Sequence, residues 1–243
     1  YSSDKGVLYT ADKKELIKAP SSTALKIYTV CDGTESIANN AFSNSVLTVI
    51  NVSDSVKTLG NYVFANCYSL KELNLGKNTE SVGNGLLSSQ AYKTPMSITK
   101  LTLPDNLKAI GNNTYGDNGN YQTAVSVLEI SADAETVPSV FYNRATLKEI
   151  NVAEGGKNYS SDKGVLYNGD KTVLIKCPRS TEAFEYKIAD ETTTVSSAAF
   201  EGTGHKEVYF PAGIRTIGNS VFNSSLKIIY GYKGTVAETY ANE

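Results

Sequence analysis

The chain has few of the residues from which metal sites and disulfide frameworks are built. Its 243 residues include three cysteines, one histidine, one methionine and no tryptophan. Structural zinc sites need closely spaced cysteine and histidine ligands, and the chain has no Cys-x-x-Cys pair, so we expect no metal site and no cofactor. Because an odd number of cysteines also argues against a disulfide framework, we interpret Cys31, Cys67 and Cys177 as small apolar residues.

Long apolar runs and a strong excess of charge are missing as well. No stretch approaches the roughly 20 apolar residues of a membrane-spanning helix, so we expect no membrane insertion within this segment. The formal net charge is -2 and the lysines and arginines are scattered, so we expect no nucleic-acid partner. No basic and apolar leader opens the chain, which begins at Tyr1 inside a repeated unit. We therefore expect a fragment of a longer protein, whose leader and anchor lie outside this segment.

Motifs of catalysis are also missing. The sequence contains no Gly-x-Ser-x-Gly elbow and no Walker A loop. A cysteine protease would need a cysteine beside the single histidine, His205, and nothing in the sequence brings the two together. We read His205 as a residue at the start of a strand. Residues 117–120 lack the closing acidic residue of an EF-hand loop, so we read them as a polar turn. The chain is therefore predicted not to be an enzyme.

What the sequence does contain is a long internal duplication. Residues 1–9 recur letter for letter as residues 159–167, and the match continues without a gap as far as Phe42 and Phe200. The second copy holds two apolar stretches separated by residues 168–171, which begin with the hairpin signal Asn-Gly. We therefore predict one β-hairpin unit used twice, at 1–20 and at 159–178. Tyr9 and Tyr167 hold matching positions in it, so we favour structural roles for both.

A shorter repeat runs through the rest of the chain. Its signature is apolar-x-x-apolar-x-apolar, with the central residue at positions 28, 50, 73, 101, 128, 150, 186, 208 and 229. Apolar residues at a spacing of two predict a short strand. A step of about 22 residues is typical of leucine-rich repeats, whose coils must stack to bury their apolar positions. We expect about nine coils in a single domain over residues 1–243, with the short strands in one continuous parallel sheet.

A second signature follows most of these strands. It consists of an aliphatic residue, usually followed by a glycine or a small residue, and then an aromatic residue or leucine, which in all but one case lies five positions after the aliphatic residue. We interpret this segment as a helical turn or an irregular arc, in which glycine permits a tight bend, as at Gly60, Gly111 and Gly218. An acidic residue recurs shortly before the aliphatic one, and we read this recurrence as a row of solvated surface residues, namely Glu35, Glu80 and Glu135.

Three steps are clearly longer than 22 residues, namely those from 73 to 101, from 101 to 128 and from 150 to 186, the last of which contains the second copy of the duplicated unit. Polar, turn-rich insertions at 88–95 and 116–121 are predicted to be surface loops. Residues 229–243 are predicted to form a capping segment that covers the last coil.

Together these features resemble the BspA-like class of bacterial leucine-rich repeats. The resemblance rests on the apolar ladder, on residues 64–73, on the duplicated hairpin and on the ending at 229–241. The internalin-type pattern fits poorly, because only Asn78 falls where an asparagine would close a strand. The resemblance implies an α+β repeat solenoid of right-handed coils with inserted β-hairpins, and an extracellular or cell-surface location. It also implies adhesion to host or microbial partners for some members, and it implies no catalytic residues.

A partner of such a solenoid would meet the outward residues of the strands. Stacked coils align these residues into rows across one face, which suits a protein or a glycan partner. The row after the central apolar position holds the candidate binding residues Asn51, Asn74, Thr102, Glu129, Asn151, Lys187, Tyr209 and Tyr230. Asparagine and threonine can bind sugars or peptides and can equally be ordinary solvated strand residues. The insertions at 88–95 and 116–121 are the alternative contact points, since loops vary freely while the coils keep their shape.

Two functions fit these observations. The first is a non-catalytic recognition or adhesion module that binds a protein or glycan on host or microbial surfaces. The second is a structural spacer that presents another domain of a longer surface protein.

Overall fold

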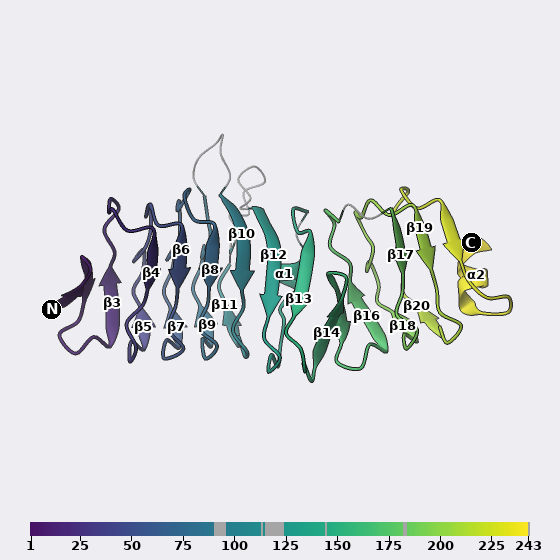
Figure 1. The fold of residues 1–243 in the computed structure, drawn as a ribbon, viewed down its shortest axis with the longest axis horizontal. Coiled ribbons are helices and arrows are strands. Elements are labelled where there is room, and N and C mark those ends of the chain that lie inside the picture. The colour runs from purple at the N-terminus through teal and green to yellow at the C-terminus, as the bar shows by residue number, and fades with distance from the viewer. Residues whose placement is uncertain (90–95, 113, 115–123, 144, 182–183, 243) are drawn as a thin grey trace. The chain divides into compact units, whose positions relative to one another are not determined.

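The computed structural model describes residues 1–89, 96–112, 114, 124–143, 145–181 and 184–242. The chain forms two compact units, unit 1 with residues 1–126 and 135–138, and unit 2 with residues 127–134 and 139–243. Both units consist mainly of short strands joined by turns, and the helices of the described part are α1 (Ser139–Tyr142) and α2 (Val236–Asn242) (Figure 1). The predicted insertion at 116–121, with the turn at 117–120, and residues 90–95 of the other insertion lie outside the described residues.

The repeat signature forms a strand at every predicted central position, which confirms the repeat. In unit 1 the parallel strands of this first layer are β4 (Ile27–Thr29), β6 (Val49–Asn51), β8 (Glu72–Asn74) and β10 (Ser97–Thr102), followed in the chain by β12 (Ala124–Ile130) (Figure 1). The pairing register sets the central residues side by side, so that Tyr28 pairs with Ile50 and Ile50 with Leu73. These side chains are buried, because one coil covers the apolar face of the next.

The second signature begins in most copies with a short strand at its aliphatic residue, which we did not predict. The rest of the signature forms turns, and in the copy that ends at Phe141 it forms the helical turn α1, as we predicted. In unit 1 it gives a second parallel layer of two-residue strands, β5 (Ser36–Ile37), β7 (Thr58–Leu59), β9 (Ser81–Val82) and β11 (Ala109–Ile110). Their aliphatic residues, such as Ile37 and Leu59, are buried. Two residues are too few to show a period of two, so the pattern alone could not identify a strand. Between the layers lie the rings of Phe42 and Phe64, stacked with their centroids 5.5 Å apart.

The duplicated unit is a three-stranded antiparallel meander rather than a two-stranded hairpin. Its strands are β1 (Ser2–Asp4), β2 (Val7–Tyr9) and β3 (Glu15–Lys18) in unit 1, and β14 (Tyr159–Asp162), β15 (Val165–Asn168) and β16 (Val173–Lys176) in unit 2. The predicted pairing of the last two strands is confirmed. The tight turn, however, is Lys163–Gly164, where both residues have positive φ as a type I′ turn requires. The third strand of each meander then joins the second layer in parallel.

In unit 2 the first layer is divided by the second meander. One part is β12 with β13 (Glu149–Val152), and the other is the parallel sheet of β17 (Glu185–Lys187), β19 (Glu207–Tyr209) and β21 (Ile228–Tyr230). The second layer continues from β16 through β18 (Thr194–Val195) to β20 (Thr216–Ile217). The predicted parallel strands are present, but they do not form the single continuous sheet that we expected, because β13 and β17 belong to different sheets.

The core of unit 2 ends at α2, within the segment predicted to cap the last coil. Phe200 lies at the centre of this core, with ring centroids 5.9 Å from Tyr186 and 5.0 Å from Phe222. From α2, Ala237 is buried and the Tyr240 ring lies 6.0 Å from that of Phe222. Helix α2 therefore adds apolar side chains to the far end of the core.

The repeated glycine serves close stacking of the coils rather than a bend. Neither Gly60 nor Gly218 has a positive φ. A Cβ atom at Gly60 would lie 2.5 Å from Asn39 Oδ1, and one at Gly218 would lie 2.4 Å from the backbone nitrogen of Ser197. Our explanation of these glycines by a tight bend was therefore wrong, because it considered one coil alone and the constraint comes from the preceding coil.

Candidate functional site

In unit 1 the side chains of the predicted binding row are hydrogen-bonded to one another. Asn51 Nδ2 donates to Thr29 Oγ1 (3.2 Å), and Asn74 Nδ2 donates to Asn51 Oδ1 (2.7 Å). Thr102 Oγ1 donates to Asn74 Oδ1 (2.6 Å) and extends this side-chain ladder to β10. The amide groups of this stretch therefore have partners before any ligand arrives. A ligand here would compete with contacts that hold neighbouring coils in register.

In unit 2 the row forms two separate stretches. On β12 and β13, Asn151 Nδ2 donates to Glu129 Oε1 (3.3 Å). On β17, β19 and β21, Lys187, Tyr209 and Tyr230 are register partners. The rings of Tyr209 and Tyr230 stack with centroids 4.2 Å apart and planes 8° from parallel. This stretch thus presents an ordered aromatic pair on the outer face of a parallel sheet.

Two adjoining hollows open in unit 2 beside the second meander. The larger has a volume of about 620 Å³, and its lining includes Asn151 on β13, Lys163 in the meander turn and Thr181. The smaller, of about 280 Å³, shares Lys163 and Thr181 with the first and is bordered by Lys187 on β17 and by Tyr209. Small-molecule sites commonly occupy about 300–1,000 Å³. Asn151 of the predicted row therefore borders a hollow within this range, and Lys187 and Tyr209 border one just below it.

An asparagine ladder that the sequence analysis missed runs along the second layer of unit 1. Asn39 Oδ1 accepts a hydrogen bond from the backbone N–H of Asn61 (2.7 Å), and Asn61 Oδ1 accepts one from that of Asn84 (2.8 Å). Asn84 Oδ1 continues the ladder to the N–H of Asn112 (2.7 Å). The signal was present, because an asparagine stands two positions after the aliphatic residue in each of these coils. These asparagines satisfy backbone donors and are structural.

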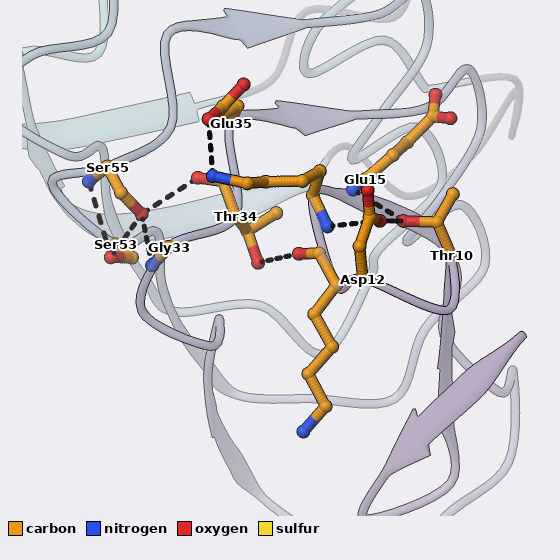
Figure 2. A network of polar contacts seen from close by, with 10 residues as sticks. Thr10, Asp12, Glu15, Gly33, Thr34, Glu35, Ser53 and Ser55 are labelled. Carbon is orange, nitrogen blue, oxygen red and sulfur yellow. Dashed lines mark hydrogen bonds and ion pairs between the residues drawn. The ribbon is translucent and has the colours of Figure 1, made fainter.

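The acidic row predicted on the surface is exposed, and its members also pair with neighbouring coils. Lys14 Nζ lies 2.6 Å from Glu35 Oε1, within a polar network that links the first three coils (Figure 2). In the same network Thr34 Oγ1 donates to the backbone oxygen of Lys13 (3.0 Å). The ammonium of Lys14 lowers the pKa of Glu35 through their hydrogen bond. Such exposed pairs add little stability. We therefore interpret this row as contacts between neighbouring coils and not as a site of chemistry.

Both copies of the meander are tied to the following strand by a pair of buried tyrosines. The hydroxyls of Tyr9 and Tyr28 lie 2.7 Å apart, and those of Tyr167 and Tyr186 lie 2.8 Å apart. Burial raises the pKa of Tyr9 and of Tyr167 to about 12. In each copy the second hydroxyl also donates to the aspartate of the first meander strand. Tyr9 and Tyr167 are therefore structural residues, as predicted.

The structure brings together one cysteine and the single histidine, which nothing in the sequence indicated. Cys177 Sγ lies 3.9 Å from His205 Nδ1, and both side chains are buried in the core of unit 2. Burial raises the pKa of the Cys177 thiol and lowers that of His205, so both groups are neutral. A thiolate–imidazolium pair needs the opposite shifts and an open approach for substrate. This contact is therefore packing, as is the buried Cys67.

Among the residues that the structure describes, no group of three or more histidine, cysteine, aspartate or glutamate side chains is arranged to hold a metal ion. Within the same residues, no helix has the length and apolar character needed to cross a membrane.

Comparison with known proteins places the chain in a family. A model of the BspA type leucine-rich repeat region matches it in six copies, over residues 21–122, 86–186 and 173–233. A solved leucine-rich repeat protein from Eubacterium ventriosum ATCC 27560 is 21% identical with a TM-score of 0.51, and the match covers 93% of this chain and 69% of that one. No curated protein matches the sequence.

Two other solved structures are similar to the chain over much of its length. The pneumococcal vaccine antigen PcpA is 25% identical with a TM-score of 0.44, and the match covers 82% of this chain and 44% of that one. A leucine-rich cell surface protein from Faecalibacterium prausnitzii A2-165 is 18% identical with a TM-score of 0.42, over 94% of this chain and 76% of that one. The chain spans less than half the length of the pneumococcal antigen. Because the family model matches most of the residues, the chain belongs to the BspA type leucine-rich repeat family.

Proposed function

We propose that the chain is a non-catalytic recognition module that binds a macromolecular partner through the first strand layer of its coils. The observation that carries this proposal is the pair of adjoining hollows in unit 2, which reach the predicted row at Asn151, Lys187 and Tyr209. A rigid repeat scaffold with a recessed polar surface is suited to binding, because the coils fix the positions of the outward side chains. The family is generally non-catalytic, which agrees with this assignment.

We further propose that the module acts outside the cell, either secreted or displayed on the surface of a bacterium. The support is the BspA type of its repeats, since the resemblance to that class implies an extracellular location. Antibody staining of intact bacteria that express the full protein is the direct test. Staining that appears only after the cells are made permeable would contradict an exposed location.

Binding is best tested by blocking one face of unit 2 at a time. In a Cys31→Ser background the remaining thiols, Cys67 and Cys177, are buried, so a single introduced cysteine can be labelled with a bulky polymer. Lys187→Cys places the label on the predicted row, and Arg215→Cys places it just before β20 of the second layer. Both positions are exposed, which makes the two variants a matched pair.

The labelled proteins would be applied to arrays of glycans and of extracellular matrix proteins. We expect the unlabelled protein to bind at least one array component, the label at residue 187 to abolish that binding, and the label at residue 215 to leave it intact. Equal loss from both labels would remove the assignment to this face. If the unlabelled protein binds nothing on either array, the recognition function fails and the spacer is the better account.

A further inference from the structure

We propose that the smaller hollow of unit 2 and its neighbour bind a neutral oligosaccharide, with one sugar ring stacked on the side chain of Tyr209. This inference rests on the proposed function, because it names the class of ligand that the recognition face takes.

Tyr209 forms a fixed aromatic wall of the smaller hollow. Its ring stacks on Tyr230 in a nearly parallel arrangement, and its hydroxyl donates to Glu207 Oε2 (3.3 Å), so two contacts hold the ring in place. Tyr230 lies on β21, whereas Glu185 and Lys187, which border the hollow, lie on β17 at the opposite side of β19. The ring face that is not covered by Tyr230 is therefore the one turned toward the hollow. Such a face packs against the C–H groups of a sugar ring while losing little conformational freedom.

The remaining lining supplies hydrogen-bonding groups of every kind that vicinal hydroxyls require. The Glu185 carboxylate accepts, the Lys163 ammonium donates, and the Thr181 hydroxyl and the Asn151 amide do both. The ammonium of Lys187 forms an ion pair with Asp190 (3.0 Å). A few placed polar groups beside an apolar surface are the usual composition of a site that fixes the orientation of its ligand.

The charge of the lining favours a neutral ligand. Among the residues that the structure describes, three lysines and two glutamates border the two hollows, so the formal charges of these residues nearly cancel. A polyanion or a polycation would be attracted by an excess of one sign, which these residues do not provide. The charged lining residues are Lys148, Lys163, Lys187, Glu149 and Glu185.

A peptide is the main competitor, because β17 is the edge strand of its sheet. Peptides that add a strand to an edge gain specificity from pockets that accept alternate side chains. Apart from the tyrosines, Val165 is the only apolar side chain among the described residues that line the two hollows. The hollows therefore offer a peptide little beyond main-chain hydrogen bonds, whereas a sugar meets both the aromatic wall and the polar groups.

The first meander provides an internal comparison, because it repeats the framework of the smaller hollow without the aromatic wall. Lining residues of the second copy that recur unchanged in the first are Lys163, Val165, Thr181 and Tyr186. Those that differ are Glu185, Lys187 and Tyr209, whose counterparts by strand register are Ile27, Thr29 and Asn51. Two of the exchanged residues, Glu185 and Tyr209, are ones that our proposal assigns to the ligand, so the aromatic wall and its neighbouring carboxylate belong to the second copy alone. Their counterparts also supply replacements that this scaffold accommodates.

The test compares Tyr209→Asn with Tyr62→Asn on an array of neutral and acidic oligosaccharides that also carries peptides. Asn is the residue that the first copy holds in place of Tyr209. Tyr62 is the matched control, because it is an exposed tyrosine of unit 1 with a positive φ that asparagine adopts readily. Circular dichroism before the array confirms that each variant is folded. The best neutral sugar is then titrated calorimetrically against all three proteins.

We expect binding to short neutral hexose oligosaccharides that is weakened roughly tenfold by Tyr209→Asn and unchanged by Tyr62→Asn, a loss typical of one aromatic contact. Tyr209→Trp should restore binding. Because the chain has no tryptophan, its fluorescence would also report the sugar directly. Sugar binding that Tyr209→Asn leaves unchanged would overturn the proposal. Binding to peptides or acidic sugars alone would overturn it as well, while leaving the recognition function in place. Binding to nothing would reject both.

Discussion

Replacing Gly218 by alanine should destabilise unit 2 strongly, whereas the same change at Gly213 in the same coil should not. A Cβ atom at Gly218 would lie 2.4 Å from the backbone nitrogen and 2.7 Å from the Cα of Ser197. Backbone atoms of the preceding coil cannot rotate away, so the two coils must separate. At Gly213 nothing lies within 4 Å of the added atom, and its φ is not positive. The two variants therefore carry the same glycine-to-alanine change and differ in how closely the preceding coil approaches the added atom.

The size of the effect follows from the bonds that hold these coils together. Separation would stretch the hydrogen bonds from Gly218 N to Val195 O (2.9 Å) and from Ala198 N to Asn219 O (3.0 Å). Losing two such bonds costs about 2 kcal/mol. Overpacking adds about 1–3 kcal/mol. The lower entropy of the unfolded alanine chain returns about 0.4–1 kcal/mol. We therefore expect a net loss of about 3 kcal/mol for Gly218→Ala and a gain of about 0.4–1 kcal/mol for Gly213→Ala.

Urea unfolding followed by far-ultraviolet circular dichroism measures both variants, since the chain has no tryptophan to report by fluorescence. A loss of about 3 kcal/mol also lowers Tm by roughly 12 °C for a two-state unit of about 110 residues, which is the size of unit 2. Hydrogen exchange should place the loss in β18 and β20, whose pairing the added atom opposes. If Gly218→Ala were as stable as Gly213→Ala, the explanation of the repeated glycine by coil stacking would be wrong.

Three further perturbations test the side-chain ladders, the tyrosine pairs and the buried thiols. In urea unfolding, Asn74→Asp should lower the free energy of unfolding by about 1–2 kcal/mol, because the side-chain ladder of the binding row uses the N–H donor of Asn74. Asn61→Asp should change it by less than about 0.5 kcal/mol, because the second-layer ladder uses the side-chain oxygen of Asn61. Equal effects of the two substitutions would contradict these two ladders. Burial raises the pKa of Tyr167 to about 12, so the stability it provides is complete below pH 10 and lost as the pH rises through 12. Absorbance at 295 nm should show exposed tyrosines ionising first and a late step that coincides with unfolding, and ionisation of all the tyrosines near pH 10 in the folded protein would refute this. Burial likewise raises the pKa of the Cys67 thiol to about 12, so a thiol reagent at pH 8 should modify Cys67 only after denaturation. Peptide mass spectrometry measures this modification. Rapid modification of Cys67 in the native protein would contradict its burial.

The repeat was predictable because its evidence lies within one coil or recurs at a fixed distance. Each strand of the first layer needs an apolar residue at its centre, and residues such as Ile50 and Leu73 announce this by their spacing. The duplication was equally plain in the sequence, and its two copies form the same meander. The predictions that were wrong concern residues whose identity is set by contact with an adjacent coil, such as Gly60, which packs against Asn39. A sequence read along one coil does not contain that constraint.

The hollows could not have been predicted for a related reason. Asn151 and Lys187 were singled out as members of one row, yet the meander between them in the chain separates β13 from β17. The hollows arise from that separation, and the meander turn at Lys163 then becomes part of their lining. The spacing of the strands predicts the row, but it does not predict that the meander interrupts the row between β13 and β17. The contact between Cys177 and His205 was missed similarly, because it joins two coils through side chains whose spacing follows no repeat.

The two meanders show why exchange of outward residues is by itself weak evidence of function. Framework residues are constrained, since the paired hydroxyls of Tyr167 and Tyr186 are buried and Gly164 has a positive φ. Outward residues such as Glu185 lack these constraints, so they can change for no functional reason. Tyr209 differs from a merely tolerated residue in that its ring is held by two contacts and turned toward a hollow. Ordering an exposed ring costs side-chain entropy, which a bound sugar would offset and bulk water would not. The function of the second copy therefore depends on whether that ring meets a ligand, which the Tyr209→Asn comparison decides.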